Sequence, residues 1–429
     1  MANVETLGTL ERRVSVAVAA DEVERKVDER LKQLARNVRM PGFRPGKVPL
    51  KLIAQTYGPQ VRSEVLSDAV QKSFTDAVKE ANLRVAGYPK FESTKDLEFS
   101  ATFEIYPEVK VGDLAAATIE RPQVEVDDAA LDKTIEILRK QRTRFEPASR
   151  PAQDNDRLTV DFRGTIDGQG FPGGEAKDFV FALGAGRMLP EFEAAARGMS
   201  AGEEKTFDLT FPADYHGKEV AGKKASFTMT LKKIDAPVLP EVDAEFAKTL
   251  GVADGDTAKM RAEVRANVER EVKKRVEARV KDQALQALLS ATPLEVPKAL
   301  VGMEAASMAE RAAADLKARG VDPTQVPINP QAFEETARRR VALGLIINEL
   351  KQSENVNPKP AEVRAMVEQE AQSYESPAEV VKWFYMQPQR LSEMEAMALE
   401  SNVVKWVLTK AKVLDKPVTF DELMGGNSS

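Results

Sequence analysis

The sequence contains no cysteine and a single histidine, His216, among 429 residues. The absence of cysteine excludes disulfide bonds, thiolate nucleophiles and cysteine-based metal sites. A single histidine excludes every metal site built from several histidines. No run approaches the roughly 18 consecutive apolar residues of a membrane-spanning helix, and the first ten residues lack the apolar run of a secretory signal. We therefore expect a cytoplasmic protein with no cofactor, no metal and no membrane partner.

Length and charge give a coarse picture of the molecule. A chain of 429 residues is long enough for about two to four domains. With 62 basic and 68 acidic residues the net charge is −6, which is mildly acidic. A hydrophobic share of 42% permits sizeable cores, and a charged share of 30% favours extensive hydrated surface.

One stretch of this acidic chain is strongly basic. Every ionisable residue from Arg30 to Lys51 is basic, and residues 41–49 read PGFRPGKVP. Proline fixes φ and glycine permits positive φ, so this pattern predicts a shaped loop tip. A hydrated charged turn is the simplest interpretation. A phenylalanine held between cations is more typical of a docking device, in which an apolar anchor is combined with charges for an acidic partner.

The residues around this loop predict an α+β domain that ends near residue 112. The alternation at 14–18 predicts a strand, and apolar residues at every third or fourth position predict a helix over 21–38. A second helical pattern covers 50–83, and Gly58–Pro59 predicts a break within it. Residues 97–105 alternate again, which is typical of a strand with one hydrated face.

The segment 113–149 predicts one helix over 127–145. Asp127 is a suitable N-cap residue, and Pro147 and Pro151 end the pattern. The amino-acid composition then changes, and the following region is rich in glycine, phenylalanine and threonine. We expect a compact β domain there, with strands at 158–162, 177–183, 205–211 and 225–234 and one short helix at 190–196.

From Pro240 onward the pattern is helical almost to the end. The longest stripe repeats every four residues and comprises Met260, Val264, Val268, Val272, Val276, Val280, Ala284 and Leu288. Four residues exceed one helical turn by about 40°, so the stripe drifts around most of the helix. Such a helix must be wrapped by its neighbours or present apolar surface in several directions. Further helices are predicted at 300–319, 332–350, 360–374, 377–385 and 391–412.

Methionine is concentrated in this helical region, where eight of the thirteen methionines lie. Flexible thioethers fill irregular cores, which is the better interpretation for any single one, but they also suit surfaces that bind many partners. We expect an open helical cradle with apolar patches in a polar surface.

The aromatic residues of the β domain resemble those of the FKBP-type prolyl isomerases in order and spacing, although an ordinary aromatic core is the plainer interpretation. The blocks concerned are VDFRGT at 160–165, FVFALG at 179–184, MLPEF at 188–192 and FPADYHG at 211–217. The resemblance covers roughly 150–235 and implies a curved antiparallel sheet around one helix. It assigns the pocket to Phe162, Phe171, Phe179, Met188, Leu189, Phe192, Tyr215 and Phe227.

Such a pocket needs little conventional chemistry. Rotation about an X–Pro bond faces a barrier of about 18–20 kcal/mol because of amide resonance. A dry aromatic pocket that favours the twisted amide lowers this barrier without a nucleophile or metal. The resemblance makes the Leu189 N–H a donor to the substrate, and we prefer a surface or packing role for His216. Pro172 stands where free-standing family members carry Asp, so one polar contact to inhibitors is missing.

Segments at both ends of the chain resemble the bacterial trigger factor family. GFRPGKVP at 42–49 is similar to its ribosome-docking signature, and ARRRVALGL at 337–345, YESP at 374–377 and residues 411–424 resemble its C-terminal segments. The resemblance covers essentially the whole chain. It implies ribosome-binding roles for Gly42, Phe43, Arg44, Gly46 and Lys47.

This resemblance implies a multidomain α+β protein. Its parts are a ribosome-docking α+β domain at 1–112, an arm at 113–149 that packs with the C-terminal helices, an FKBP-like antiparallel β domain with one helix at 150–236, and an all-α chaperone domain at 237–429. The implied activity is ATP-independent: the protein binds nascent and unfolded polypeptides and isomerises X–Pro bonds. The implied partners are the ribosome near its exit tunnel, through a ribosomal protein and ribosomal RNA, and a second copy of the chain away from the ribosome.

Two rival functions stay open on the residues alone. One is a prolyl isomerase whose extra domains only dimerise, and it predicts no ribosome association. The other is a ribosome-assembly factor that binds RNA through the basic loop, although that loop carries one aromatic residue where RNA platforms usually stack several.

Overall fold

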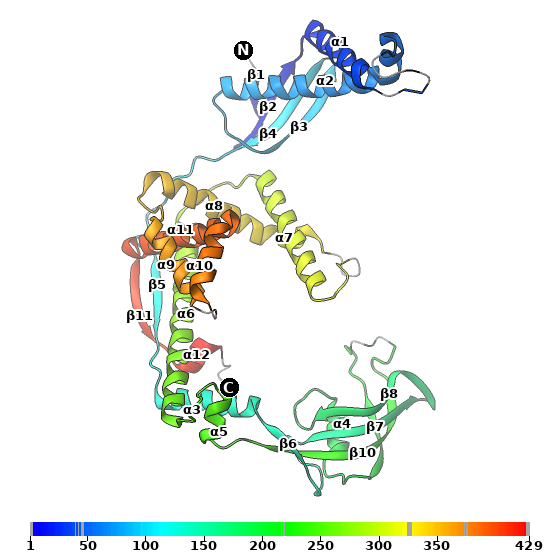
Figure 1. The fold of residues 1–429 in the computed structure, drawn as a ribbon, viewed down its shortest axis with the longest axis vertical. Coiled ribbons are helices and arrows are strands. Elements are labelled where there is room, and N and C mark those ends of the chain that lie inside the picture. The colour runs from blue at the N-terminus through cyan, green and yellow to red at the C-terminus, as the bar shows by residue number, and fades with distance from the viewer. Residues whose placement is uncertain are drawn as a thin grey trace. The chain divides into compact units, whose positions relative to one another are not determined.

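The computed structural model describes residues 3–38, 40–41, 43, 47–95, 97–215, 217, 219–323, 328–372, 374 and 376–425. The chain forms two compact units, one of residues 1–122 with 277–416 and the other of residues 123–276 with 417–429. Figure 1 labels the elements of both. None of the helices in the described ranges is long and apolar enough to cross a membrane.

The first unit begins with a four-stranded antiparallel sheet and two helices. Its elements are β1 (Asn3–Thr6), β2 (Glu11–Ala17), α1 (Ala20–Asn37), α2 (Leu50–Glu80), β3 (Val85–Lys95) and β4 (Glu98–Ile105), with strand order β1-β2-β4-β3. Alternate residues of β2 and β4 bury their side chains beneath α2, which lies across the sheet (Figure 1). The Phe74 ring of α2 meets Phe103 of β4 edge to face at 5.1 Å.

The break predicted at Gly58–Pro59 is wrong, because α2 continues through both residues. Proline inside a helix costs about 3 kcal/mol through the lost hydrogen bond and the ring clash. Ile53 before the proline and Val61 and Val65 after it are all buried in one cluster with residues of α1. Burial of such side chains stabilises by about 1.5–3 kcal/mol each, so packing outweighs the local penalty.

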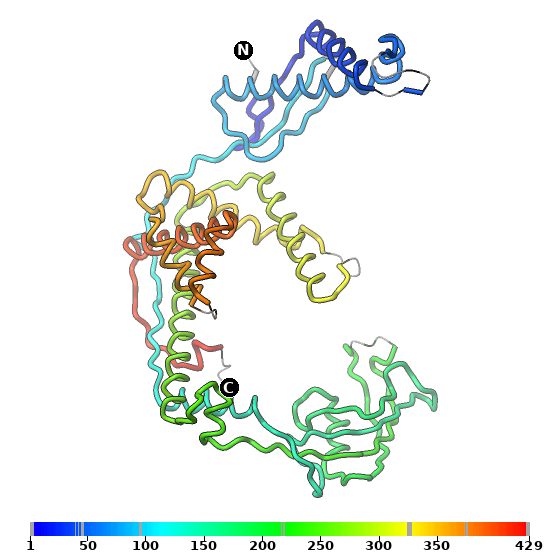
Figure 2. The backbone as a smooth tube through the Cα atoms, viewed as in Figure 1, coloured from blue at the N-terminus to red at the C-terminus, as the bar shows by residue number. Residues whose placement is uncertain are grey.

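The remainder of the first unit is mainly helical. It contains the C-terminal part of α6 (Thr257–Ala291), from Glu277 onward, together with α7 (Lys298–Ala318), η2 (Pro330–Phe333), α8 (Glu334–Ser353), α9 (Pro360–Ala371), α10 (Pro377–Met386) and α11 (Pro388–Lys410). Proline begins α9, α10 and α11, where its missing N–H has no helical partner to lose. After α11 the chain forms β11 (Lys412–Pro417), which pairs with β5 (Thr118–Gln123) in a two-stranded sheet. The tube in Figure 2 shows these two segments running side by side.

Of the two arrangements expected for the four-residue stripe, α6 shows the wrapped helix, because stripe residues are buried in both halves of the helix. In the second unit, Met260 to Val272 are buried against α3 (Asp128–Gln141), α5 (Ala244–Thr249) and α12 (Phe420–Met424). In the first unit the neighbours are different. Gln283 donates to the Glu120 carbonyl of β5 at 2.7 Å, and Lys281 pairs with Glu400 of α11 at 2.6 Å.

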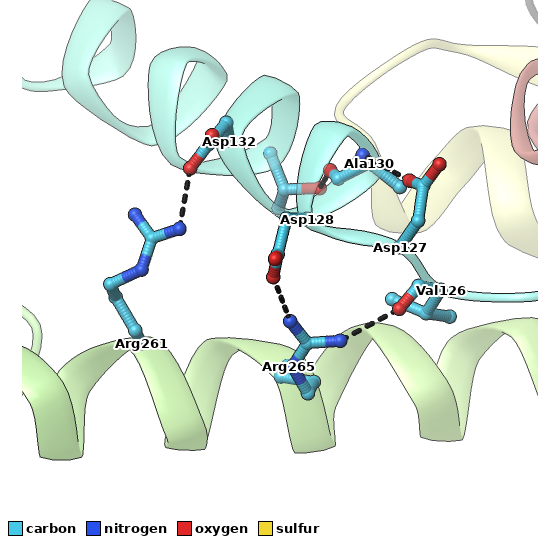
Figure 3. Close-up of polar contacts among 8 residues, drawn as sticks. Val126, Asp127, Asp128, Ala130, Asp132, Arg261 and Arg265 are labelled. Atoms are coloured by element: carbon cyan, nitrogen blue, oxygen red, sulfur yellow. Dashed lines mark hydrogen bonds and ion pairs between the residues drawn. The ribbon is translucent and has the colours of Figure 1, made fainter.

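Polar contacts fix α3 onto the first half of α6 (Figure 3). The Asp127 side chain caps α3 by accepting from the Ala130 N–H at 2.8 Å, as predicted. Arg265 of α6 donates to the Val126 carbonyl at 2.7 Å and to the Asp128 carboxylate, and Arg261 donates to Asp132 at 2.6 Å. These side chains are largely exposed, so the contacts orient α3 while the buried apolar cluster supplies most of the stability.

The rest of the second unit is the β domain. It consists of β6 (Arg144–Pro147), β7 (Arg157–Ile166), β8 (Gln169–Ala182), α4 (Pro190–Ala196), β9 (Glu204–Thr210) and β10 (Lys224–Val238). The antiparallel sheet has the order β6-β10-β7-β8, and β9 also pairs with β10. Its core gathers the apolar residues of the sheet and of α4 into one cluster.

The helix predicted over 127–145 ends earlier, at Gln141, and residues 144–147 form β6 instead. The strand pairs with β10, and Pro147 stands opposite Asp235. The Ala148 N–H donates to the Ile234 carbonyl at 2.9 Å. The chain therefore enters and leaves the β domain on two neighbouring strands.

Candidate active site

The β domain holds a cavity of about 570 Å³. Residues from all parts of the domain line it: Phe162, Phe171, Pro172, Gly173, Gly186, Arg187, Met188, Leu189, Phe192, Leu209, Phe211, Tyr215, Gly217, Val220 and Phe227. Strands β7, β8, β9 and β10, helix α4 and two loops contribute to the wall. Most of these side chains are aromatic or aliphatic, and the exceptions among those described are the Arg187 guanidinium and the Tyr215 hydroxyl.

Seven of the eight pocket residues expected from the sequence line this cavity. The exception is Phe179, whose ring stands behind the wall and meets Phe162 edge to face at 5.5 Å. Phe211 was missed, although it belongs to the quoted aromatic blocks. Its ring lies 4.9 Å from that of Tyr215, a proximity that depends on the turn between them and not on spacing alone.

The floor of the cavity is a set of interlocked rings. Phe192 of α4 is 2% exposed. Its ring lies 5.4 Å from that of Phe162 and 6.0 Å from that of Phe227, both at steep angles. Edge-to-face pairs of this kind hold rings in fixed orientations. The floor is therefore closely packed and apolar.

Two glycines make room for these rings. A Cβ at Gly164 would lie 2.5 Å from the Phe227 ring, and one at Gly174 would lie 2.9 Å from the Phe171 ring. Both distances are shorter than carbon atoms tolerate, so each glycine permits an aromatic side chain to lie flat on the neighbouring backbone.

The Leu189 backbone is arranged as a donor at the cavity edge. Leu189 is the N-cap of α4 with extended φ and ψ, and Pro190 follows it. Its carbonyl accepts from the N–H groups of Phe192 and Glu193. No acceptor in the described ranges takes a hydrogen bond from the Leu189 N–H, so this donor is available to a bound carbonyl group.

The comparisons with known proteins agree with this geometry. The family model for FKBP-type peptidyl-prolyl cis-trans isomerases matches residues 148–232, and the models for bacterial trigger factor protein and for its C-terminus match residues 1–138 and 256–409. The trigger factor of Azoarcus sp. is 55% identical over 97% of this chain and 96% of its own length. That of Nitrosospira multiformis is 54% identical over 99% of each. The chain belongs to the bacterial trigger factor family.

Membership settles the general activity. The protein is a ribosome-associated chaperone that carries an FKBP-type prolyl isomerase domain. Among solved structures, one of a trigger factor chaperone aligns with 95% of this chain and 99% of its own at 18% identity, with a TM-score of 0.46.

Two carboxyl groups with lowered pKa values, those of Asp156 and Asp235, lie outside the cavity. Burial opposes ionisation of Asp156, but Arg150, at 2.6 and 2.8 Å, and the Gln153 N–H hold its pKa below the usual value. Lys233 and, against the effect of burial, Arg157 lower the pKa of Asp235 in the same way. The Asp235–Arg157 pair joins the end of the β domain to its beginning, and the Asp156–Arg150 pair holds the segment that leads into β7, so both aspartates have a structural role.

The expected ribosome-docking residues are only partly within the described ranges. Gly42, Arg44 and Gly46 lie outside them, as does His216. Phe43 is 41% exposed and Lys47 is exposed. Val48 next to them is buried against the cluster of α1 and α2. An inward-facing valine thus anchors a loop whose described neighbours present a phenyl ring and a cation to solvent.

The helical region of the first unit exposes large apolar side chains on α10, α11 and the turn before α10. They are Tyr374, Trp383, Tyr385, Met386 and Met397. Met386 is 81% exposed. These side chains are the aromatic and methionine types expected of a surface that adapts to many partners.

Proposed function

We propose that the cavity of about 570 Å³ is the isomerase site and that the eight residues expected from the sequence form or support it. The observation that carries this proposal is the convergence of seven of them on one apolar cavity beside an available N–H group. Phe179 supports the wall through its contact with Phe162. Arg187, Phe211 and the other lining residues complete it.

The mechanism uses shape and desolvation. The prolyl ring enters the apolar cavity, and the preceding carbonyl leaves the amide plane as the bond twists. Amide resonance is lost in the twisted state, so a cavity lined mainly by aromatic and aliphatic side chains favours this state over the solvated planar amide. The Leu189 N–H donates to a carbonyl of the substrate and holds the chain while the bond rotates. Every contact that is stronger in the twisted state raises the rate.

The other parts of the chain have separate tasks in this proposal. Residues 1–112 dock on the ribosome near the exit tunnel through Gly42, Phe43, Arg44, Gly46 and Lys47. Their partners there are a ribosomal protein and the phosphates of ribosomal RNA.

Residues 113–149 join the helices of 237–429, which hold nascent and unfolded chains without ATP, and residues 150–236 are the isomerase. The protein works in the cytoplasm and forms a homodimer away from the ribosome. The exposed aromatic and methionine side chains of α10 and α11 support a holding role for the helices.

The pH profile of isomerase turnover tests the mechanism. The described residues of the cavity wall include no carboxylate, and the sequence contains no cysteine. We therefore expect a rate that is nearly flat from pH 6 to 8 and indifferent to thiol reagents and chelators. A bell-shaped profile with a limb near neutrality would instead give His216 a chemical role and would contradict catalysis by shape alone.

A further inference from the structure

One residue breaks the apolar character of the cavity wall. Among the described residues that line it, Arg187 carries the only charged side chain. It is exposed to solvent, whereas Phe192 and Phe227 at the floor are buried. Within the described ranges, no carboxylate forms an ion pair or hydrogen bond with its guanidinium group. The domain therefore holds an unpaired cation at the mouth of its cavity.

The backbone fixes where this cation stands. Arg187 follows Gly186, which has a φ of 67°, and lies two residues before Leu189, the N-cap of α4. In the proposed mechanism the Leu189 N–H holds a substrate carbonyl. A peptide bound there passes within a few residues' length of Arg187, because one extended residue spans about 3.3 Å and an arginine side chain is longer than that.

Other arginines of the β domain are placed differently. Arg150, Arg157 and Arg197 are paired with Asp156, Asp235 and Asp154. The Arg157 and Arg197 pairs join segments that are distant in sequence, and the Arg150 pair holds the segment that leads into β7. Arg187 forms no ion pair with a described residue. Its charge is therefore free to interact with a peptide that approaches the cavity.

We propose that Arg187 is a specificity-determining residue of the isomerase, which selects proline sites with an acidic side chain beside the proline over sites with a basic one. This inference rests on the proposed function of the cavity. Opposite charges attract at the mouth while the apolar floor takes the prolyl ring. An acidic neighbour is thus favoured by its charge and a basic neighbour is repelled by the same group.

The size of the effect follows from exposure. An ion pair between exposed side chains changes an equilibrium by about 1.4- to 5-fold. Attraction of glutamate and repulsion of lysine act together, so the ratio of kcat/KM values for the two peptides is on the order of 2- to 25-fold. The Debye length is about 8 Å at physiological salt and shortens as salt is added. The Glu-to-Lys ratio of kcat/KM values therefore falls towards one as the salt concentration is raised.

The test uses the full-length protein and proline tetrapeptides that carry Glu, Gln or Lys at each position within two residues of the proline. We expect a Glu-over-Lys preference at one or more positions, its loss in Arg187→Gln and its reversal in Arg187→Glu. Arg163→Glu is the matched control, because Arg163 is an exposed arginine of β7 that does not line the cavity. It makes the same change in net charge and should keep the preference.

The outcomes separate the inference from the function on which it rests. Isomerase activity with equal kcat/KM for Glu and Lys peptides at low salt would overturn the role of Arg187 and leave the cavity assignment intact. An equal shift in Arg187→Glu and Arg163→Glu would assign the preference to net charge and overturn it too. Activity on no peptide would overturn the proposed function itself.

Discussion

Substitution of Phe192 by leucine tests the assignment of the cavity in the most detail. The Phe192 ring forms the floor and meets the rings of Phe162, Phe181, Phe207 and Phe227 at 5.4–6.0 Å. Leucine keeps an apolar side chain at this position but removes every ring contact. We expect Phe192→Leu to lower kcat/KM for a proline peptide at least tenfold, which corresponds to about 1.4 kcal/mol of lost transition-state stabilisation.

The same contacts set the expected loss of stability. An aromatic pair contributes about 0.5–1.5 kcal/mol beyond its buried area, so four pairs at the lower figure give about 2 kcal/mol. A domain with a free energy of unfolding of about 5–15 kcal/mol stays folded after such a loss. Truncation to alanine would cost about 3–5 kcal/mol and would confuse unfolding with loss of activity.

Phe181→Leu is the matched control. Phe181 belongs to the same core and contacts Phe192 at 5.7 Å and Phe179 at 6.2 Å, but it does not line the cavity. Urea unfolding of both variants measures the stability loss, and a coupled peptide assay at a temperature where both are folded measures kcat/KM. Equal activity in the two variants would refute the placement of the site.

The remaining predictions concern docking and acid stability. The triple variant Phe43→Ala, Arg44→Ala and Lys47→Ala should lose co-sedimentation with purified ribosomes while its Tm stays nearly unchanged, and undiminished binding would remove the docking role of the loop. Wild-type binding should also weaken as salt rises, because exposed charges are screened. The pKa of Asp156 is lowered, so its stabilisation is complete above the unfolded value of about 3.9 and is lost as pH falls below it. Asp156→Asn should therefore cost about 1–3 kcal/mol at pH 7 and flatten the acid limb of the stability curve, while the exposed Asp154→Asn changes the curve little.

Local patterns predicted most of the helices and strands, and the departures have physical causes. The N-cap at Asp127 and the short helix at 190–196 depend on neighbours in sequence and were confirmed. The continuity of α2 through Pro59 depends on burial of Val61 and Val65, which no local pattern expresses.

Strands whose partners are distant in sequence escaped prediction. Residues 144–147 form a strand because β10, some 90 residues later, pairs with them. Residues 412–417 form a strand because β5 stands beside them. Neither segment alternates clearly enough on its own to be distinguished from the helix next to it.

The candidate site, like the fold, was predictable where it depends on local sequence and unpredictable where it depends on contacts between distant segments. Aromatic residues in separated blocks could be assigned to one pocket through a family resemblance, and seven of them line one cavity. The resemblance could not show that Phe179 stands behind the wall, or that Arg187 is the charged residue among the described lining residues. Both facts depend on which face of a strand or turn meets the cavity.

The separation of isomerase and chaperone tasks is the central claim, and one deletion tests it most directly. Pro147 stands opposite Asp235, and the Ala148 N–H is bonded to the Ile234 carbonyl. Replacing residues 149–233 by a short Gly/Ser turn therefore leaves β6 and the end of β10 as a hairpin. An inserted domain carries its own core, and the cluster of the β domain contains no residue of α3 or α6, so the remainder should stay folded.

The measurement is light scattering of a denatured, proline-poor client mixed with the wild type or with the deletion variant, with circular dichroism and ribosome co-sedimentation as controls for folding. We predict that the deletion variant suppresses aggregation and binds ribosomes as the wild type does, while its isomerase activity is lost. A folded deletion variant that no longer suppresses aggregation would show that the isomerase domain is itself a main client-binding surface, and the division of tasks would be wrong.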